Sequence, residues 1–113
     1  MEFKFEKLVI WQKAMDFGEE IHQMVLKFPN FELFGLSSQS IKAADSIALD
    51  NAEGSIGQSN PEQKRFMGYS IRSLAEVITC LHNAKRRDYI SEEDFQSIYA
   101  EAFTLMNMMV GFK

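Results

Sequence analysis

The sequence has 113 residues, of which 46% are hydrophobic and 25% charged, and its formal net charge is −4. This length and apolar content indicate one folded domain with its own core and exclude an intrinsically disordered chain. The negative charge disfavours a dedicated nucleic-acid-binding protein, which usually has a basic surface, but it allows a local basic patch.

Apolar residues recur every three or four positions near the N-terminus and predict a first helix over 5–28. One seam of apolar side chains begins at Ile10 and a second begins at Leu8, so the apolar stripe is wider than a bundle core usually needs. Pro29 ends this helix, because proline cannot continue it and disfavours helical backbone at the preceding residue.

The next segment is rich in Ser, Ala and Gly and predicts a second, tightly packed helix over 32–55, since small side chains let helices approach closely. Gly54 and Gly57 supply its stop, as glycine often does at helix C-termini. Asp50 and Glu53 precede this stop on a face that otherwise resembles a buried one, which raises the question of whether they carry chemistry.

A third helix is expected over 61–87, with Asn60 as its N-cap and Pro61 at its first position. Ser91 predicts the cap of a fourth helix over 92–111. Both helices again carry two neighbouring apolar seams.

Four amphipathic helices with short connections predict an all-α protein, an antiparallel up-down-up-down four-helix bundle in a single domain spanning 1–113. The double seams of the first, third and fourth helices exceed what one bundle needs to bury, so we expect self-association. A squat bundle that buries both seams is the alternative.

The only cysteine, Cys80, leaves no disulfide framework and no zinc constellation, and it reads as a small buried side chain. The N-terminal segment mixes charged with apolar residues, and no stretch is apolar enough to span a membrane. We therefore expect a cytoplasmic protein with no signal peptide, no membrane partner and no cofactor.

Several motifs resemble, in order and spacing, the four-helix-bundle family encoded in intervening sequences of bacterial large-subunit ribosomal RNA. They are "WQKAMDF", "FPNFELFGLSSQSIKAADSI", "AEGS" and "SLAEV". The resemblance covers nearly the whole chain and rests on Phe28, Pro29, Glu32, Gly35, Leu36, Gln39, Ala43, Ala44, Ser46, Ile47, Ala52, Glu53, Gly54, Phe66, Ser73, Leu74 and Glu76. It implies a homopentamer without an established enzymatic activity.

The family pattern has Asn where this chain has Asp50, Ile where it has Asn51, and commonly Gly where it has Arg72. A related branch includes the accessory protein of diversity-generating retroelements, which resembles a basic pentamer that binds nucleic acid and the reverse transcriptase. Five copies of this chain at −4 each would instead carry about −20, which repels phosphate at long range.

A helical bundle raises the question of a di-iron site, which needs two Glu-x-x-His pairs and two further glutamates. Glu19 and His22 form one such pair, but Thr79 stands where His82 would need a glutamate. A complete site is therefore not expected, and both histidines are interpreted as surface or partly buried side chains.

Gln39, Asp50, Glu53 and Glu76 are polar residues within the family motifs. Their functional interpretation is a carboxylate cluster with shifted pKa values. We favour the alternative, that they satisfy buried polar partners near helix ends, because no nucleophile–base pair or phosphate loop accompanies them. Asp50, Asn51 and Glu53 are expected to close and tether the second helix.

Basic residues cluster on the third helix and at its end, and they are the best candidates for contact with nucleic acid or an acidic partner: Lys64, Arg65, Arg72, Lys85, Arg86 and Arg87. The favoured alternative is a solvated face with local pairs to Glu62, Asp88 and Glu92. The Met-rich "LMNMMVGF" is either an adaptable partner surface or, as we favour, core within or between chains.

These observations predict a non-catalytic oligomeric protein that acts through protein or nucleic-acid binding. The alternative is a nucleic-acid-binding accessory subunit of a reverse transcriptase or RNA-processing complex.

Overall fold

The computed structural model describes residues 1–57 and 59–112, and over these residues the chain has four α-helices and no strand. The helices are α1 (Val9–Val25), α2 (Leu36–Ser55), α3 (Asn60–Arg86) and α4 (Glu92–Phe112). Two short 3₁₀ segments, η1 (Lys4–Lys7) and η2 (Asn30–Glu32), precede α1 and α2. The prediction of an all-α protein with four helices is confirmed, but the first two helices begin four residues later than predicted.

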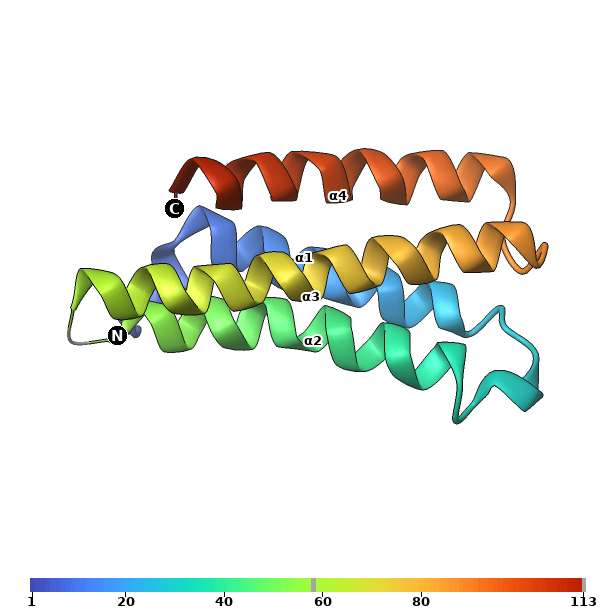
Figure 1. Ribbon diagram of the computed structural model, residues 1–113, viewed down its shortest axis with the longest axis horizontal. Coiled ribbons are helices and arrows are strands. Elements are labelled where there is room, and N and C mark those ends of the chain that lie inside the picture. The colour runs from blue at the N-terminus through green and yellow to red at the C-terminus, as the bar shows by residue number, and fades with distance from the viewer. Residues whose placement is uncertain (58, 113) are drawn as a thin grey trace.

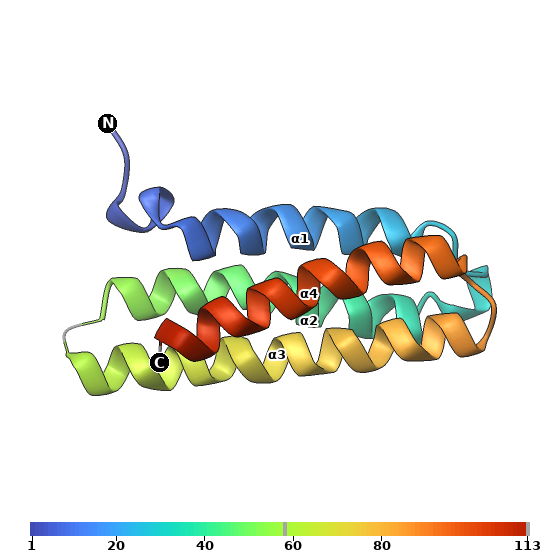
Figure 2. The same ribbon diagram turned by 90° about the horizontal axis from the view of Figure 1, so that it is seen from above.

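The helices lie side by side along the long axis of a molecule that measures 43 × 27 × 24 Å. The α1–α2 and α3–α4 connections lie at one end, whereas the C-terminal end of α2 and the start of α3 lie at the other (Figure 1). α2 packs on α1 and α3 from one side, and α4 packs on the same two helices from the other. Seen from above, α4 is tilted across the other three helices (Figure 2).

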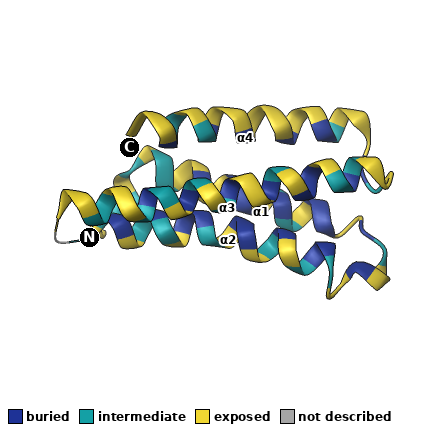
Figure 3. Ribbon diagram, in the orientation of Figure 1, coloured by how far each residue is buried: buried dark blue, intermediate teal, exposed yellow. Residues whose placement is uncertain are grey.

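Small residues bring α2 and α3 together, as the composition of α2 predicts. The buried Ser70 hydroxyl of α3 donates a hydrogen bond to the Ile47 carbonyl oxygen of α2, at 2.9 Å. A Cβ atom at Gly54 would lie only 3.0 Å from the Cβ of Phe66. The buried positions of the helices face one shared core (Figure 3).

Serine hydroxyls cap α3 and α4. The Ser91 hydroxyl accepts the Asp94 N–H at 3.0 Å, as predicted. At α3 the cap is Ser59, whose hydroxyl accepts the Glu62 N–H at 3.3 Å. The predicted cap, Asn60, is therefore the first helical residue, because the preceding serine takes the extended conformation that a cap needs.

Candidate interaction surfaces

Three of the six predicted basic contacts form a group on α3. Lys64, Arg65 and Arg72 are exposed on its N-terminal half, and they line a shallow hollow of about 380 Å³ together with Tyr69. The Arg65 guanidinium lies 5.2 Å from the ring centre of Phe66. Within the described residues none of the three cations has a carboxylate partner, so their charges face solvent.

The basic residues at the end of α3 have internal partners instead. Lys85 Nζ lies 2.9 Å from a Glu92 carboxylate oxygen and 4.3 Å from the ring centre of Phe95, as the local-pair alternative predicts. Arg87 Nη1 donates to Glu32 Oε2 at 2.9 Å. Lys85 and Arg87 therefore have intramolecular carboxylate partners near the α3–α4 turn, while Arg86 is exposed, and contact of these three residues with nucleic acid or an acidic partner stays a prediction.

Glu32 is the centre of a hydrogen-bond network at the end of the bundle that contains the α3–α4 turn. Its Oε2 accepts the Tyr89 hydroxyl at 2.8 Å as well as Arg87, and its Oε1 accepts the Leu36 N–H at 3.1 Å. Donation by Tyr89, then by the Leu36 N–H, with Arg87 nearby, lowers the pKa of Glu32. This carboxylate ties the start of α2 to the end of α3.

The predicted structural role of three polar residues does not hold. Gln39, Glu53 and Glu76 are exposed, and in the described chain their side chains make no hydrogen bond to a buried group. Helix α2 is closed by backbone and serine bonds, such as Ser55 Oγ to the Ala52 carbonyl oxygen at 2.8 Å. These local bonds satisfy the helix end and leave the glutamate in solvent.

Asp50 and Asn51 lie at the same end of α2. Asp50 is half-buried, and burial followed by the charge of Glu53 raises its pKa. Asn51 is buried, with 6% of its surface exposed. It therefore faces the core, unlike the exposed Glu53.

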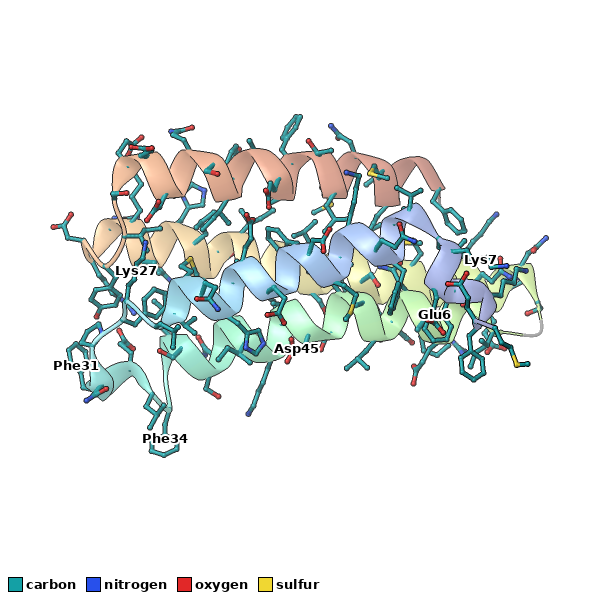
Figure 4. All side chains as sticks on the ribbon, turned by 180° about the vertical axis from the view of Figure 1, so that it is seen from behind. Glu6, Lys7, Lys27, Phe31, Phe34 and Asp45 are labelled. Carbon is teal, nitrogen blue, oxygen red and sulfur yellow. The ribbon has the colours of Figure 1, made fainter. Side chains whose placement is uncertain are left out.

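The two histidines lie apart on the surface. His22 Nε2 lies 3.0 Å from Asp45 Oδ1 across α1 and α2, and Asp45 points toward α1 in Figure 4. His82 is exposed and its ring packs edgewise on Phe95 and Tyr99. Residues 1–57 and 59–112 contain no group of three or more His, Cys, Asp or Glu side chains placed to hold a metal ion.

An acidic pair between α1 and α4 was not predicted from the sequence. Glu20 has a raised pKa of about 7, caused by burial, by a hydrogen bond with Glu101, and by the charges of Glu101 and Asp16. Its Oε2 is buried without a partner in the described residues. The four-residue spacing of Asp16 and Glu20 was the available signal, but the contribution of Glu101 depends on how α4 packs.

Most of the second apolar seam of α4 is exposed in the single chain, although Met106 is half-buried against the core. Tyr99, Phe103, Met106 and Val110 share one flank of the helix, and Phe103 is 58% exposed. We call these four residues the α4 ridge. His82 packs on Tyr99, so the ridge runs beside α3.

Small residues form a mostly apolar groove of about 410 Å³ between α1 and α2, which Glu19 and Asp45 also line. Its floor includes Ala14, Gly18, Ala44 and Ala48, and its rim includes Met15 and Leu49, the latter 64% exposed. We call this the α1–α2 groove. By contrast, both seams of α3 are buried or half-buried, so the prediction of surplus apolar surface is wrong for this helix, because α2 and α4 cover it from two sides.

The α1–α2 connection carries a further exposed apolar cluster, formed by Leu26, Phe31, Leu33 and Phe34. Phe31 and Phe34 point away from the bundle in Figure 4. The sequence signal was three large apolar residues between Pro29 and Gly35, but a search for helical periodicity passes over a segment that is not helical.

The comparisons with known proteins agree with this architecture. The family model described as 23S rRNA-intervening sequence protein matches residues 6–111. The chain belongs to this family. The 23S rRNA-intervening sequence protein family was therefore identified correctly by the sequence motifs.

A solved structure from Bacteroides thetaiotaomicron, described as a protein with unknown function from the S23 ribosomal protein family, resembles this family member. It is 19% identical, the match covers 92% of this chain and 97% of that one, and the TM-score is 0.83. At this identity the likeness supports the fold. No curated protein matches the chain.

Neither description of this intervening-sequence family names a catalytic activity. In the described part of the chain, no helix is both long and apolar enough to cross a bilayer.

Proposed function

We propose that this protein is a non-catalytic member of its family that acts by binding, and that its up-down-up-down bundles assemble into a homopentamer. The observation that carries this proposal is that the single chain leaves two apolar surfaces open, the α4 ridge and the α1–α2 groove. The ridge offers large side chains, and the groove offers a floor of alanine and glycine. Large side chains of one helix fit between the small residues of others, so the two surfaces are complementary.

The two surfaces lie on different sides of the molecule, since the ridge runs beside α3 whereas the groove is formed by α1 and α2. A contact between two different surfaces is heterologous, and it produces a closed ring when the rotation between copies closes. A ring buries every ridge and every groove. The number five comes from the family resemblance.

A mixing experiment tests the pairing. Phe103→Lys disables the ridge, and Leu49→Lys disables the groove; both side chains are exposed, so the single chain should still fold. Each variant alone should be monomeric, because every ring contact needs one ridge and one groove. An equal mixture should form a dimer and stop there, because it retains one intact ridge and one intact groove.

Phe31→Lys is the matched control, since Phe31 is exposed but lies on neither surface. Size-exclusion chromatography with light scattering measures the masses. The proposal is wrong if Phe31→Lys dissociates the assembly while Phe103→Lys leaves it whole, or if the mixture of the two disabling variants remains monomeric.

We also propose, as a second candidate function, that the α3 group of Lys64, Arg65 and Arg72 contacts RNA phosphates. The observation that favours it is three exposed cations around Tyr69, a ring on which a base could stack. A mobility-shift titration measures the affinity for single-stranded RNA at several salt concentrations. The logarithm of the binding constant should fall with the logarithm of the salt concentration with a slope of about −2, for three phosphate contacts. No shift at low salt would contradict this function.

A further inference from the structure

A cavity of about 330 Å³ opens at the end of the bundle where both α1 and α3 begin. In Figure 2, the tilt of α4 carries its C-terminal end away from the start of α1. The walls are mostly apolar and include Leu8, Ile10, Trp11, Met67 and Phe112. An engineered apolar cavity of about 150 Å³ accommodates benzene, so this one has room for a larger ring compound.

One polar side chain in the cavity wall lacks a strong hydrogen-bond partner. Asn51 lines the cavity and is 6% exposed. Its Nδ2 lies 4.0 Å from the Met109 sulfur, a weak acceptor, and its Oδ1 has no hydrogen-bond partner in the described residues. Exchanging the two amide atoms would still leave one of them without a strong partner. Buried amides in proteins are normally hydrogen-bonded, so this group requires an explanation.

The charges around the cavity are balanced. Lys4 and Asp50 line it, one with each sign, and its other lining residues carry no formal charge. An ion would lose its hydration in such an apolar site, and the opposite charges of Lys4 and Asp50 give no net attraction for either sign to offset that loss. The site therefore favours an uncharged guest with one polar group.

We propose that this cavity binds a small, uncharged, mostly apolar molecule whose single hydroxyl or amide group pairs with Asn51. The apolar part of the guest fills the space beside Trp11 and Met67, and a rotation of the buried Asn51 amide toward that space lets the polar group of the guest supply the hydrogen bond that Asn51 lacks. This site is separate from the α4 ridge and differs from the basic group on α3.

Trp11 is the only tryptophan in the sequence and lines the cavity, so its fluorescence reports occupancy. The probes are benzyl alcohol and toluene, which are similar in shape but of which only the first has a hydroxyl. Both should change Trp11 emission in a saturable way. Asn51→Leu should lower the affinity for benzyl alcohol about three- to tenfold, the range expected for the loss of one hydrogen bond. It should change the affinity for toluene less than twofold.

Asn107→Leu, at an exposed position of α4, is the matched control and should leave both affinities unchanged. Ser55→Phe places a ring at the cavity wall and should abolish binding of both probes. Far-UV circular dichroism checks that each variant is folded, and Asn51→Val replaces Asn51→Leu should the latter fail to fold.

Three results would overturn the proposal. The first is that neither probe gives saturable binding below its solubility limit. The second is that Ser55→Phe still binds both probes, which would place their site elsewhere. The third is that the Asn51 variant lowers the affinity for both probes by the same factor.

Discussion

At the residue scale, two carboxyl groups, the buried Glu32 and the half-buried Glu20, have opposite environments. Glu32 accepts hydrogen bonds from Tyr89, Leu36 and Arg87, and these donors lower its pKa. Glu20 meets a second carboxyl group on α4 instead, and its pKa rises to about 7. Since the sign of each pKa shift sets the pH range in which the group affects folding, the two residues give opposite predictions.

Glu32→Gln should lower the melting temperature at neutral pH by several degrees, because the neutral amide forms weaker bonds with Arg87 and Tyr89. In the folded protein the pKa of Glu32 lies below its usual 4.5, so its stabilisation is complete above that pH and is lost as the pH falls. The difference in melting temperature between wild type and variant should therefore shrink in acid.

The exposed Glu53 provides the matched substitution for Glu32, and Glu53→Gln should have a much smaller effect. Thermal melts followed by circular dichroism measure both. Equal changes in melting temperature for the two variants would show that the hydrogen bonds of Glu32 contribute no more to stability than a surface carboxylate does.

Glu20→Gln should raise the melting temperature above pH 7. The folded protein keeps the Glu20 proton up to a pKa of about 7, whereas the unfolded chain releases it near 4.5. The folded state therefore binds more protons between these values, and stability falls as the pH rises through that interval. Glutamine cannot ionise, so the variant should avoid this loss.

The same melts on Glu19→Gln, an exposed neighbour on α1, provide the comparison for Glu20. A Glu20→Gln curve that runs parallel to the wild-type curve from pH 4.5 to 7 would contradict the assigned pKa.

At the element scale, α2 and α3 approach each other closely at Gly54 of α2. A Cβ atom there would lie 3.0 Å from the Cβ of Phe66, which is fixed to the α3 backbone and cannot rotate away. Gly54→Ala should therefore destabilise the protein, although alanine is the better helix former. Gly111→Ala, with no atom within 4 Å, should stabilise it by up to about 1 kcal/mol.

Urea unfolding measures both glycine variants. Equal gains in the free energy of unfolding for Gly54→Ala and Gly111→Ala would show that α2 and α3 do not approach as closely as described.

Apolar residues at every third or fourth position were enough to predict α1, α3 and α4, and the content of small residues predicted α2. The sequence patterns did not predict contacts between residues that lie far apart in the sequence. Arg87 and Tyr89 donate hydrogen bonds to Glu32 but follow it in the sequence by 55 and 57 positions. Glu20 meets Glu101 only because α4 packs on α1. The split of the first predicted helix into η1 and α1 follows from the extended backbone at Leu8, which no sequence signal marked.

At the scale of the whole molecule, the apolar seams divide into those that the bundle covers and those that it leaves open. α3 is covered by α2 and α4, whereas the α4 ridge and the α1–α2 groove remain exposed in the single chain. Contiguous exposed apolar surfaces of this kind often mark protein–protein contacts. This distribution is the physical basis of the proposed ring.

The mass of the unmodified protein in solution tests the proposed assembly most directly. Sedimentation velocity at several micromolar concentrations should show one species of about 65 kDa, which corresponds to five copies of 13.0 kDa. Phe103→Lys should reduce this species to a single chain. A wild-type protein that sediments at 13.0 kDa over the whole concentration range would contradict the account.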